Sequence, residues 1–180
     1  RILFNNEMVL FQNPTDKPIT TIKGGKAKGR LIGGNLSVFV SLLGSPFLPP
    51  QSPVRLPWEQ VILFLEDTHE STQTIDRMFC SLRLSGILKR VAGVIWGTCE
   101  GCSQRYVVFG YFFLLTNFFF WNNSPMSIQT ILEGHLAHVP SFMNAMIGHD
   151  GQQFTIPMGI EVEMDADKGT IQMLEKAMAD

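Results

Sequence analysis

The sequence predicts a single domain that combines α-helices and β-strands, of either the mixed α/β or the α+β class. The first observation is a strand–helix–strand pattern within residues 61–96, where two apolar runs flank a segment with helical spacing. The second is a hairpin pattern within residues 160–173. A length of 180 residues suits one domain, and a hydrophobic content of 45% is enough for a core, which excludes a disordered chain.

The N-terminal part predicts a turn followed by a short helix. The chain begins at Arg1 rather than Met, so we expect it to start inside a longer reading frame, and we interpret residues 1–22 as an entry segment. Residues 23–30 read KGGKAKGR, whose glycines predict a tight turn. The segment fails the pattern of a phosphate-binding loop, because Arg30-Leu31 stands where Lys and Ser or Thr are required. Asn35 is the expected N-cap of a short buried helix.

The middle of the chain predicts the strand–helix–strand unit. Five prolines within residues 46–57 predict a surface loop. The apolar run of residues 61–65 is typical of a strand buried on both faces, and residues 91–96 predict a second strand of this kind. Between them, Ser71 or Thr72 is the expected cap of a helix that ends near Gly86.

The C-terminal part predicts a hairpin. Apolar and acidic residues alternate over residues 160–164, a turn is expected at residues 165–169, and alternation resumes over residues 171–173. One face of this hairpin is therefore expected to meet solvent.

Charge and cysteine content exclude several classes of function. Fourteen basic and sixteen acidic residues leave a formal charge of −2, which gives no electrostatic reason to expect a nucleic acid or an anionic membrane as a partner. Three cysteines are too few for a disulfide scaffold, which favours a reducing compartment. Cys99 and Cys102 form a lone CxxC without the second pair that a structural zinc site needs, so we expect two reduced cysteines in a turn and no metal.

Two places carry residues suited to chemistry. Glu66 and Asp67, with Glu70 close behind, come where an apolar strand ends, and ligand crevices form at the carboxyl ends of strands in α/β sheets. The alternative is a solvated acidic turn. His149 has glycines within two residues on both sides, which suits an exposed imidazole on a tight loop, although a core histidine stays open. The remaining histidines, at positions 69, 135 and 138, lack such a context.

An uncharged aromatic stretch interrupts the pattern. Nine of the 19 aromatic residues lie within residues 106–121. As a helix, these 16 residues would span about 24 Å, which is short of a hydrocarbon core of about 30 Å. A membrane span is therefore disfavoured, and the stretch is either a core helix or a segment foreign to the fold.

Four motifs, taken in order, resemble the C-terminal domain of the LD-carboxypeptidase family. They are GKAKGRLIGGNLSVFVSLLGSPF, ILFLED, IDRMFCSLRLSGILKRVAGVIWG and GHDGQQFTIPMGIEVEMDADKGTIQMLE. The family comprises serine peptidases that include murein tetrapeptide carboxypeptidases and microcin-immunity peptidases. The resemblance covers roughly residues 24–175 and implies a mixed α/β domain of the swivelling β/β/α type, with the nucleophile-bearing N-terminal domain absent.

The resemblance also implies a catalytic role for two residues. Glu66 matches the glutamate of a Ser-His-Glu triad, and His149 matches its general base. The serine belongs to the N-terminal domain, and nothing in the family pattern makes Ser37 or Ser41 a nucleophile. We therefore expect the chain alone to be inactive.

The function that follows is a serine-type hydrolase that cleaves the bond to a C-terminal D-amino acid in small, murein-type peptides. The resemblance implies no metal and no organic cofactor, a cytoplasmic location, and two partners besides substrate: the N-terminal domain of the same protein and a second copy in a homodimer. The alternative is a catalytically inactive fragment or a binding module that uses the hydrophobic insertion or a missing N-terminal partner domain.

The sequence departs from the family in two places. Residues 105–123 replace what is normally a short polar loop, so we expect an insertion foreign to the fold, such as untranslated sequence retained in a gene model. A hydrophobic lid or a membrane contact is the alternative. Residues 140–143 are less apolar than the family's buried strand at this position.

Overall fold

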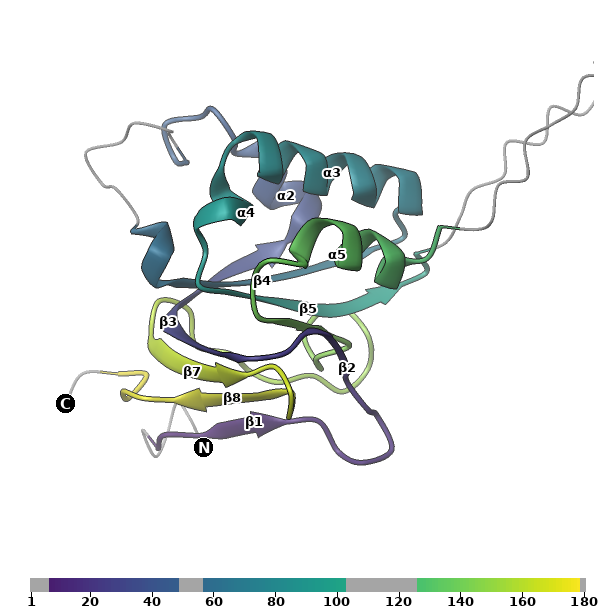
Figure 1. Ribbon diagram of the computed structural model, residues 1–180. Coiled ribbons are helices and arrows are strands. Elements are labelled where there is room, and N and C mark those ends of the chain that lie inside the picture. Colours follow the sequence, from purple (N-terminus) through teal and green to yellow (C-terminus); the bar gives the residue numbers. More distant parts are fainter. Residues whose placement is uncertain (1–6, 49–56, 103–125, 179–180) are drawn as a thin grey trace, which may run out of the picture.

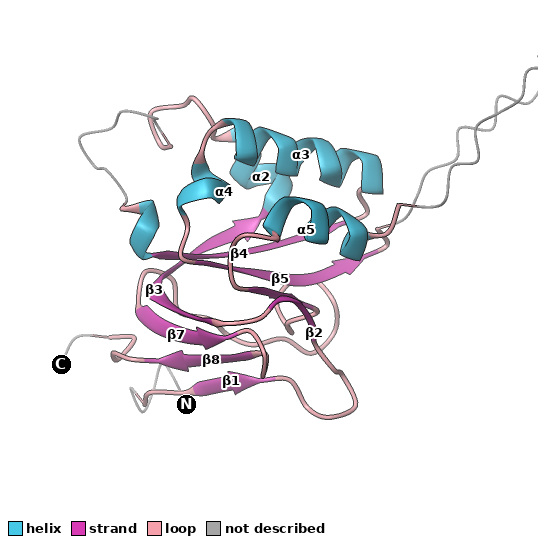
Figure 2. Ribbon diagram, in the orientation of Figure 1, coloured by secondary structure: helices cyan, strands magenta, loops and turns pink. Residues whose placement is uncertain are grey.

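One mixed β-sheet organises the domain, and its helices cover one face (Figures 1 and 2). The computed structural model describes residues 7–48, 57–102 and 126–178. Eight strands follow the order β1-β8-β7-β3-β4-β5-β6-β2. They are β1 (Leu10–Gln12), β2 (Thr20–Lys23), β3 (Lys26–Asn35), β4 (Val61–Thr68), β5 (Gly93–Glu100), β6 (Ser141–Met143), β7 (Glu161–Asp165) and β8 (Thr170–Met173). The helices are α2 (Leu36–Ser41), α3 (Thr72–Leu84), α4 (Ile87–Arg90), α5 (Ile128–Leu136) and the 3₁₀ turn η1 (Trp58–Gln60). The predicted mixed α/β class is confirmed.

The parallel part of the sheet contains the predicted strand–helix–strand unit. Strands β3, β4, β5 and β6 pair in parallel, and α3 and α4 connect β4 to β5. Seven of the eight residues of β4 are buried, as expected for a strand covered on both faces. Ser71 is the N-cap of α3, because its hydroxyl accepts a hydrogen bond from the Thr74 N–H. The strand predicted at residues 91–96 begins two residues later and runs further, to Glu100.

Antiparallel strands flank this parallel part on both sides. The predicted hairpin is β7–β8, and β7 pairs with β3 along Lys26–Arg30. Residues 1–22 hold more than an entry segment, because β1 pairs with β8 at one edge of the sheet and β2, which begins at Thr20, pairs with β6 at the other. The sequence of this segment is too short and too mixed for its alternation to indicate two strands.

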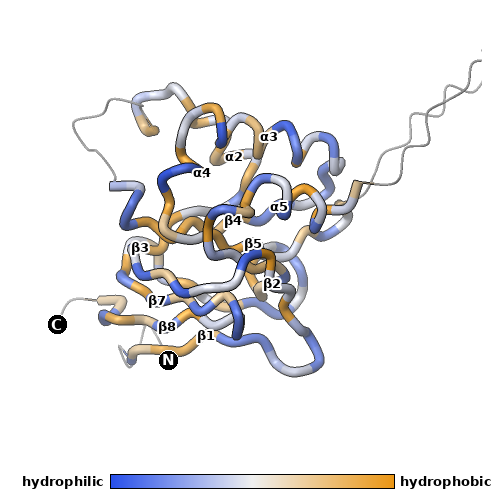
Figure 3. Tube along the Cα trace, viewed as in Figure 1, coloured by the Kyte–Doolittle hydropathy of each residue, from blue (hydrophilic) through white to orange (hydrophobic). Residues whose placement is uncertain are grey.

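The sheet separates two hydrophobic cores. One lies under the helices, where Leu63, Leu65 and Trp96 of the sheet pack against residues such as Phe79 and Leu132. The other lies on the opposite face, where β4 and β5 contact the β7–β8 hairpin and the segment that carries Ile147. Figure 3 shows the hydrophobic stretches gathered along the central strands. Burial on both faces covers β4 as far as Asp67 and β5 as far as Gly97, whereas the last residues of β5 are partly or fully exposed.

The glycine- and lysine-rich segment is a strand over most of its length, so the expectation of a tight turn is wrong for residues 26–30. The side chains of Lys26 and Lys28 lie on the exposed face of β3 and form ion pairs with Asp165 and Glu161 of β7, at 3.5 and 3.3 Å. These lysines alternate with Ala27 and Gly29, and such alternation is typical of a strand. The glycines in the segment favoured the prediction of a turn instead. The turn lies earlier, at Gly25, whose φ is +127°.

The expected short helix is confirmed as α2, with Asn35 as its N-cap. The aromatic stretch of residues 105–123 and most of the proline-rich loop lie outside the described residues. Within the described part of the chain, none of the helices is both long and apolar enough to cross a membrane.

Candidate functional site

Glu66 lies at the carboxyl end of β4, where the pairing with β5 is irregular. Leu65 is opposite Trp96 but Asp67 is opposite Cys99, so β5 contains one extra residue beside Glu66. Such a bulge redirects side chains and is common next to functional sites. The Glu66 side chain is only 7% exposed.

A loop after β6 brings His149 to this strand end. The carbonyl of Ile147 accepts hydrogen bonds from the Thr98 N–H at 2.7 Å and from the Thr98 hydroxyl at 3.2 Å. The approach requires glycine at position 97, where a Cβ atom would overlap the Ile147 carbonyl oxygen. It also requires Gly148, which has a φ of +139° and where a Cβ atom would lie 3.2 Å from Glu66 Oε2.

His149 and Glu66 are in direct contact although 83 positions separate them. Nδ1 of His149 lies 2.8 Å from Oε2 of Glu66. Because a carboxylate only accepts, Nδ1–H is the donor, and Nε2 is then the nitrogen that can take up a proton. The imidazole is 55% exposed, so this loop histidine is not a core residue.

The carboxylate makes the imidazole a stronger base. The hydrogen bond to Glu66 and the negative charge of Glu66 raise the pKa of His149 above its usual 6.5, while partial desolvation acts in the opposite direction. The charges of Asp67 and Glu100 add to the increase. The pair can therefore hold a proton taken from a neighbouring hydroxyl and return it to a leaving group.

Asp67 supports the site without facing His149. It is 2% exposed, and its two carboxylate oxygens accept four hydrogen bonds. The donors are the side-chain amide of Asn35 at 3.2 Å, the N–H and hydroxyl of Ser37 at 3.0 and 2.9 Å, and the N–H of Thr68 at 2.8 Å. These contacts attach the end of β4 to the start of α2. The hydroxyl of Ser37 is thereby used as a structural donor.

The other sequence candidates lie elsewhere or make other contacts. The ring of His69 contacts the hydroxyl of Thr68 at 2.7 Å. His138 contacts the carbonyl of Leu88 at 2.9 Å. The hydroxyl of Ser41 donates to a carbonyl of its own helix. None of these contacts involves the pair formed by His149 and Glu66.

Cys99 and Cys102 are joined by a disulfide, so the expectation of two reduced cysteines is wrong. The turn between them brings their Cα atoms to 5.4 Å, a separation that a disulfide readily spans. Sulfur atoms bonded to each other are not thiolate ligands, and the motif in this state does not offer a metal site.

One group of potential metal ligands occurs among the described residues, between α3 and α5. Ligand atoms of Asp76, Cys80 and His135 lie within 4.8 Å of one another. His135 Nε2 contacts Asp76 Oδ1 at 2.9 Å, and its Nδ1 is buried without a hydrogen-bond partner among the residues that the structure describes. We interpret the group as a contact between two helices, in which His135 of α5 shares a hydrogen bond with Asp76 of α3.

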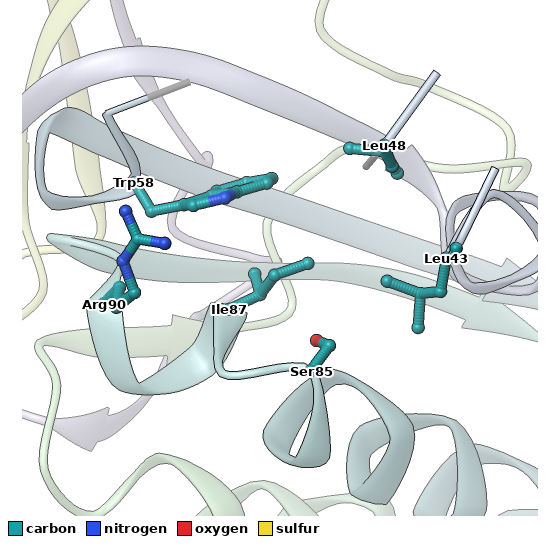
Figure 4. Close-up of a pocket in the computed structure, with 7 residues that line it drawn as sticks. Leu43, Leu48, Trp58, Ser85, Ile87 and Arg90 are labelled. Carbon is teal, nitrogen blue, oxygen red and sulfur yellow. The ribbon is translucent and has the colours of Figure 1, made fainter. Parts of the chain in front are cut away.

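A small cavity of about 120 Å³ lies at the other end of the parallel strands (Figure 4). Leu43, Leu48, Trp58, Ile87 and Arg90 are among the residues that line it. Trp58 precedes the first residue of β4, whereas Glu66 is near the last. The cavity is therefore separate from the histidine–glutamate pair.

Sequence reasoning did not identify the residues that hold this pair together. Thr98 binds a backbone carbonyl, and such a contact leaves no pattern in a single sequence. The available signal was Gly97, a glycine at the end of the apolar part of β5. The sequence points to Asp67 as a residue at the strand end but indicates no role for it. Its place beside Glu66 at a strand end was the available signal.

Known proteins are similar to this chain in both sequence and fold. The family model of the LD-carboxypeptidase C-terminal domain matches residues 28–164. A Bacillus subtilis protein named "Probable murein peptide carboxypeptidase" is 28% identical over 155 residues, covering 85% of this chain and 42% of that protein. The Escherichia coli microcin C7 self-immunity protein MccF is 27% identical over 161 residues, covering 86% of this chain and 39% of that protein.

The fold comparison agrees. A solved structure of the self-immunity protein MccF has a TM-score of 0.67 at 24% identity, covering 91% of this chain and 43% of that one. The chain spans about two fifths of the length of the curated relatives named above. With the family model matching most of its length, the chain belongs to the family of LD-carboxypeptidase C-terminal domains.

Proposed function

We propose that the chain is the C-terminal half of a serine-type LD-carboxypeptidase and supplies the base and its orienting carboxylate. The observation that carries the proposal is the 2.8 Å contact between His149 Nδ1 and Glu66 Oε2 at a strand end. In this role His149 Nε2 removes the proton of a serine hydroxyl and later protonates the leaving amine. Glu66 fixes the tautomer and stabilises the imidazolium; loss of that function costs on the order of 10⁴ in rate in a comparable triad.

The nucleophile in this proposal comes from an N-terminal domain of the same protein. The exposure of His149, set against the burial of Glu66, supports this arrangement, because the imidazole remains open to a second domain. The proposed substrates are small murein-type peptides that end in a D-amino acid, in keeping with the name of the Bacillus subtilis relative. The proposed location is the cytoplasm, and the proposed assembly is a homodimer.

The test compares the chain with a protein that contains both halves. We expect no release of D-alanine from a murein tetrapeptide by the 180-residue chain and measurable release by the two-domain protein. His149→Ala or Glu66→Ala in the two-domain protein is expected to abolish turnover, while the control Glu163→Gln, at the exposed position of β7, leaves it unchanged. Near-full turnover by both alanine variants would refute the assignment. Absence of activity in the intact two-domain protein would favour a binding module.

A further inference from the structure

We propose that Cys99 and Cys102 form a reversible dithiol–disulfide couple, a redox modification site that controls how firmly the His149 loop is attached to β5. The effect on catalysis rests on the function proposed above, whereas the modification and its effect on the loop do not. The chemical partner is a dithiol reductant in one direction and a disulfide oxidant in the other.

The two cysteines lie in an accessible turn. Both are partly exposed, and the residues between them, Glu100 and Gly101, are exposed. The Cys102 N–H donates to the Cys99 carbonyl at 3.2 Å, and Gly101 has a φ of +66°. The two cysteines pack against the core under the helices on one side but are not enclosed by it, so a thiolate approaches the disulfide from the exposed side of the turn without unfolding the domain.

The turn is attached to the end of β4. The carbonyl of Glu100 accepts hydrogen bonds from the His69 N–H at 2.7 Å and from the Thr68 hydroxyl at 3.2 Å. The His69 ring lies against Gly101, where a Cβ atom would be 3.2 Å from three ring atoms. A change in the path of this turn therefore displaces Thr68 and His69, which follow Glu66 in the sequence.

The same turn adjoins the attachment of the His149 loop. Thr98, which provides both hydrogen bonds to the Ile147 carbonyl, is bonded directly to Cys99. Across the sheet, Cys99 is paired with Asp67, the neighbour of Glu66. The disulfide therefore closes a ring from Cys99 to Cys102. This ring adjoins Thr98, which holds the His149 loop, and Asp67, which is next to Glu66. Opening the ring gives Cys99 and Thr98 more freedom and weakens the contact with Ile147.

The exchange is a two-electron reaction. A thiolate of the reductant attacks one sulfur of the Cys99–Cys102 bond, which breaks and leaves a mixed disulfide and one cysteine thiolate. The second thiol of the reductant displaces the remaining cysteine, so the reductant becomes a disulfide. The protein gains two electrons and two protons and holds two thiols.

Two measurements on the 180-residue chain test the proposal without peptidase activity. Alkylation with iodoacetamide followed by mass spectrometry, before and after dithiothreitol treatment, is expected to label Cys80 in both states and Cys99 and Cys102 only after reduction. Hydrogen exchange at the Thr98 amide, whose N–H donates to Ile147, is expected to be about tenfold faster in the reduced chain.

Variants show whether faster exchange at Thr98 comes from opening the Cys99–Cys102 disulfide or from a general effect of the reductant. Cys80→Ser is the control and is expected to keep the response of Thr98. The double variant Cys99→Ser/Cys102→Ser is expected to exchange quickly in both conditions; if it fails to fold, the reduced wild-type chain supplies the same comparison. Cysteines that stay unlabelled after reduction, or equal exchange at Thr98 in both states, would overturn the proposal. A failure of the peptidase test alone would leave these results unaffected.

Discussion

Replacing Asp67 by asparagine tests whether the carboxylate next to Glu66 organises the candidate site. The two oxygens of Asp67 each accept two hydrogen bonds: Oδ1 from Asn35 and Thr68, and Oδ2 from the N–H and hydroxyl of Ser37. Asparagine has nearly the same shape but presents an amino group in place of one oxygen. In either orientation of the amide, two of the four donors lose their acceptor.

The expected cost follows from this count. A buried polar group left without its partner costs about 1–3 kcal/mol, so two such groups cost roughly 2–6 kcal/mol. Asn35, Ser37 and Thr68 are only partly buried, so water can satisfy some of the released donors. We therefore expect Asp67→Asn to lower the free energy of unfolding by about 2–3 kcal/mol, at the low end of that range.

Urea denaturation with linear extrapolation measures this difference, provided that the variant and the wild-type chain have equal m-values. Glu163→Gln, which changes an exposed carboxylate on β7, is the matched control and is expected to change stability by less than about 0.5 kcal/mol. A loss in Asp67→Asn no greater than that of the control would refute the reasoning. It would mean that the Asp67 contacts contribute nothing beyond what water supplies.

Three further predictions concern the pair itself. Glu66→Gln is expected to lower the pKa of His149 toward 6.5, as followed by an NMR titration of the imidazole, and an unchanged pKa would contradict the contact. Because folding raises the pKa of His149, its stabilising contribution is complete below 6.5 and is lost as the pH rises through the higher folded value. The stability difference between wild type and His149→Gln should accordingly be larger at about pH 5 than at about pH 9 in denaturation experiments. Gly97→Ala places a methyl group against the Ile147 carbonyl and is expected to cost about 1–3 kcal/mol in the same assay, with no loss if the loop is not held there.

The parts of the fold that the sequence predicts are those whose signal is local. The apolar run of β4 and the capping serine of α3 depend on neighbouring residues, and both are present in the structure. The same holds for the β7–β8 hairpin, whose turn residues and alternation stand within 14 positions. Strands β1 and β2 carry no comparable signal. Each has only three or four residues of mixed character, and such a segment forms a strand only when it can pair with the edge of an existing sheet.

The glycine-rich segment shows how two local signals can compete. Gly29 is required in β3, since a Cβ atom there would overlap the carbonyl of Gln60. The glycine is thus needed for close packing against the start of β4, although glycines in a row usually indicate a turn. The alternation of Lys26 and Lys28 with smaller residues was the better guide, because it matches the exposed and inward faces of the strand.

For the site, the resemblance to a family could select His149 and Glu66, but it could not supply the contacts that hold them together. The main attachment of the loop is the hydrogen bond from the Thr98 N–H to the Ile147 carbonyl, groups that nearly every residue possesses. Such a bond leaves a trace in the sequence only where it excludes side chains, as it does at Gly97 and Gly148. A glycine at the end of an apolar strand and another beside a histidine are therefore the signals to look for in related chains. When both glycines are present, we expect a loop carbonyl to accept a hydrogen bond from the strand end, as the Ile147 carbonyl does here. The histidine of that loop then lies within hydrogen-bond distance of the carboxylate on the neighbouring strand.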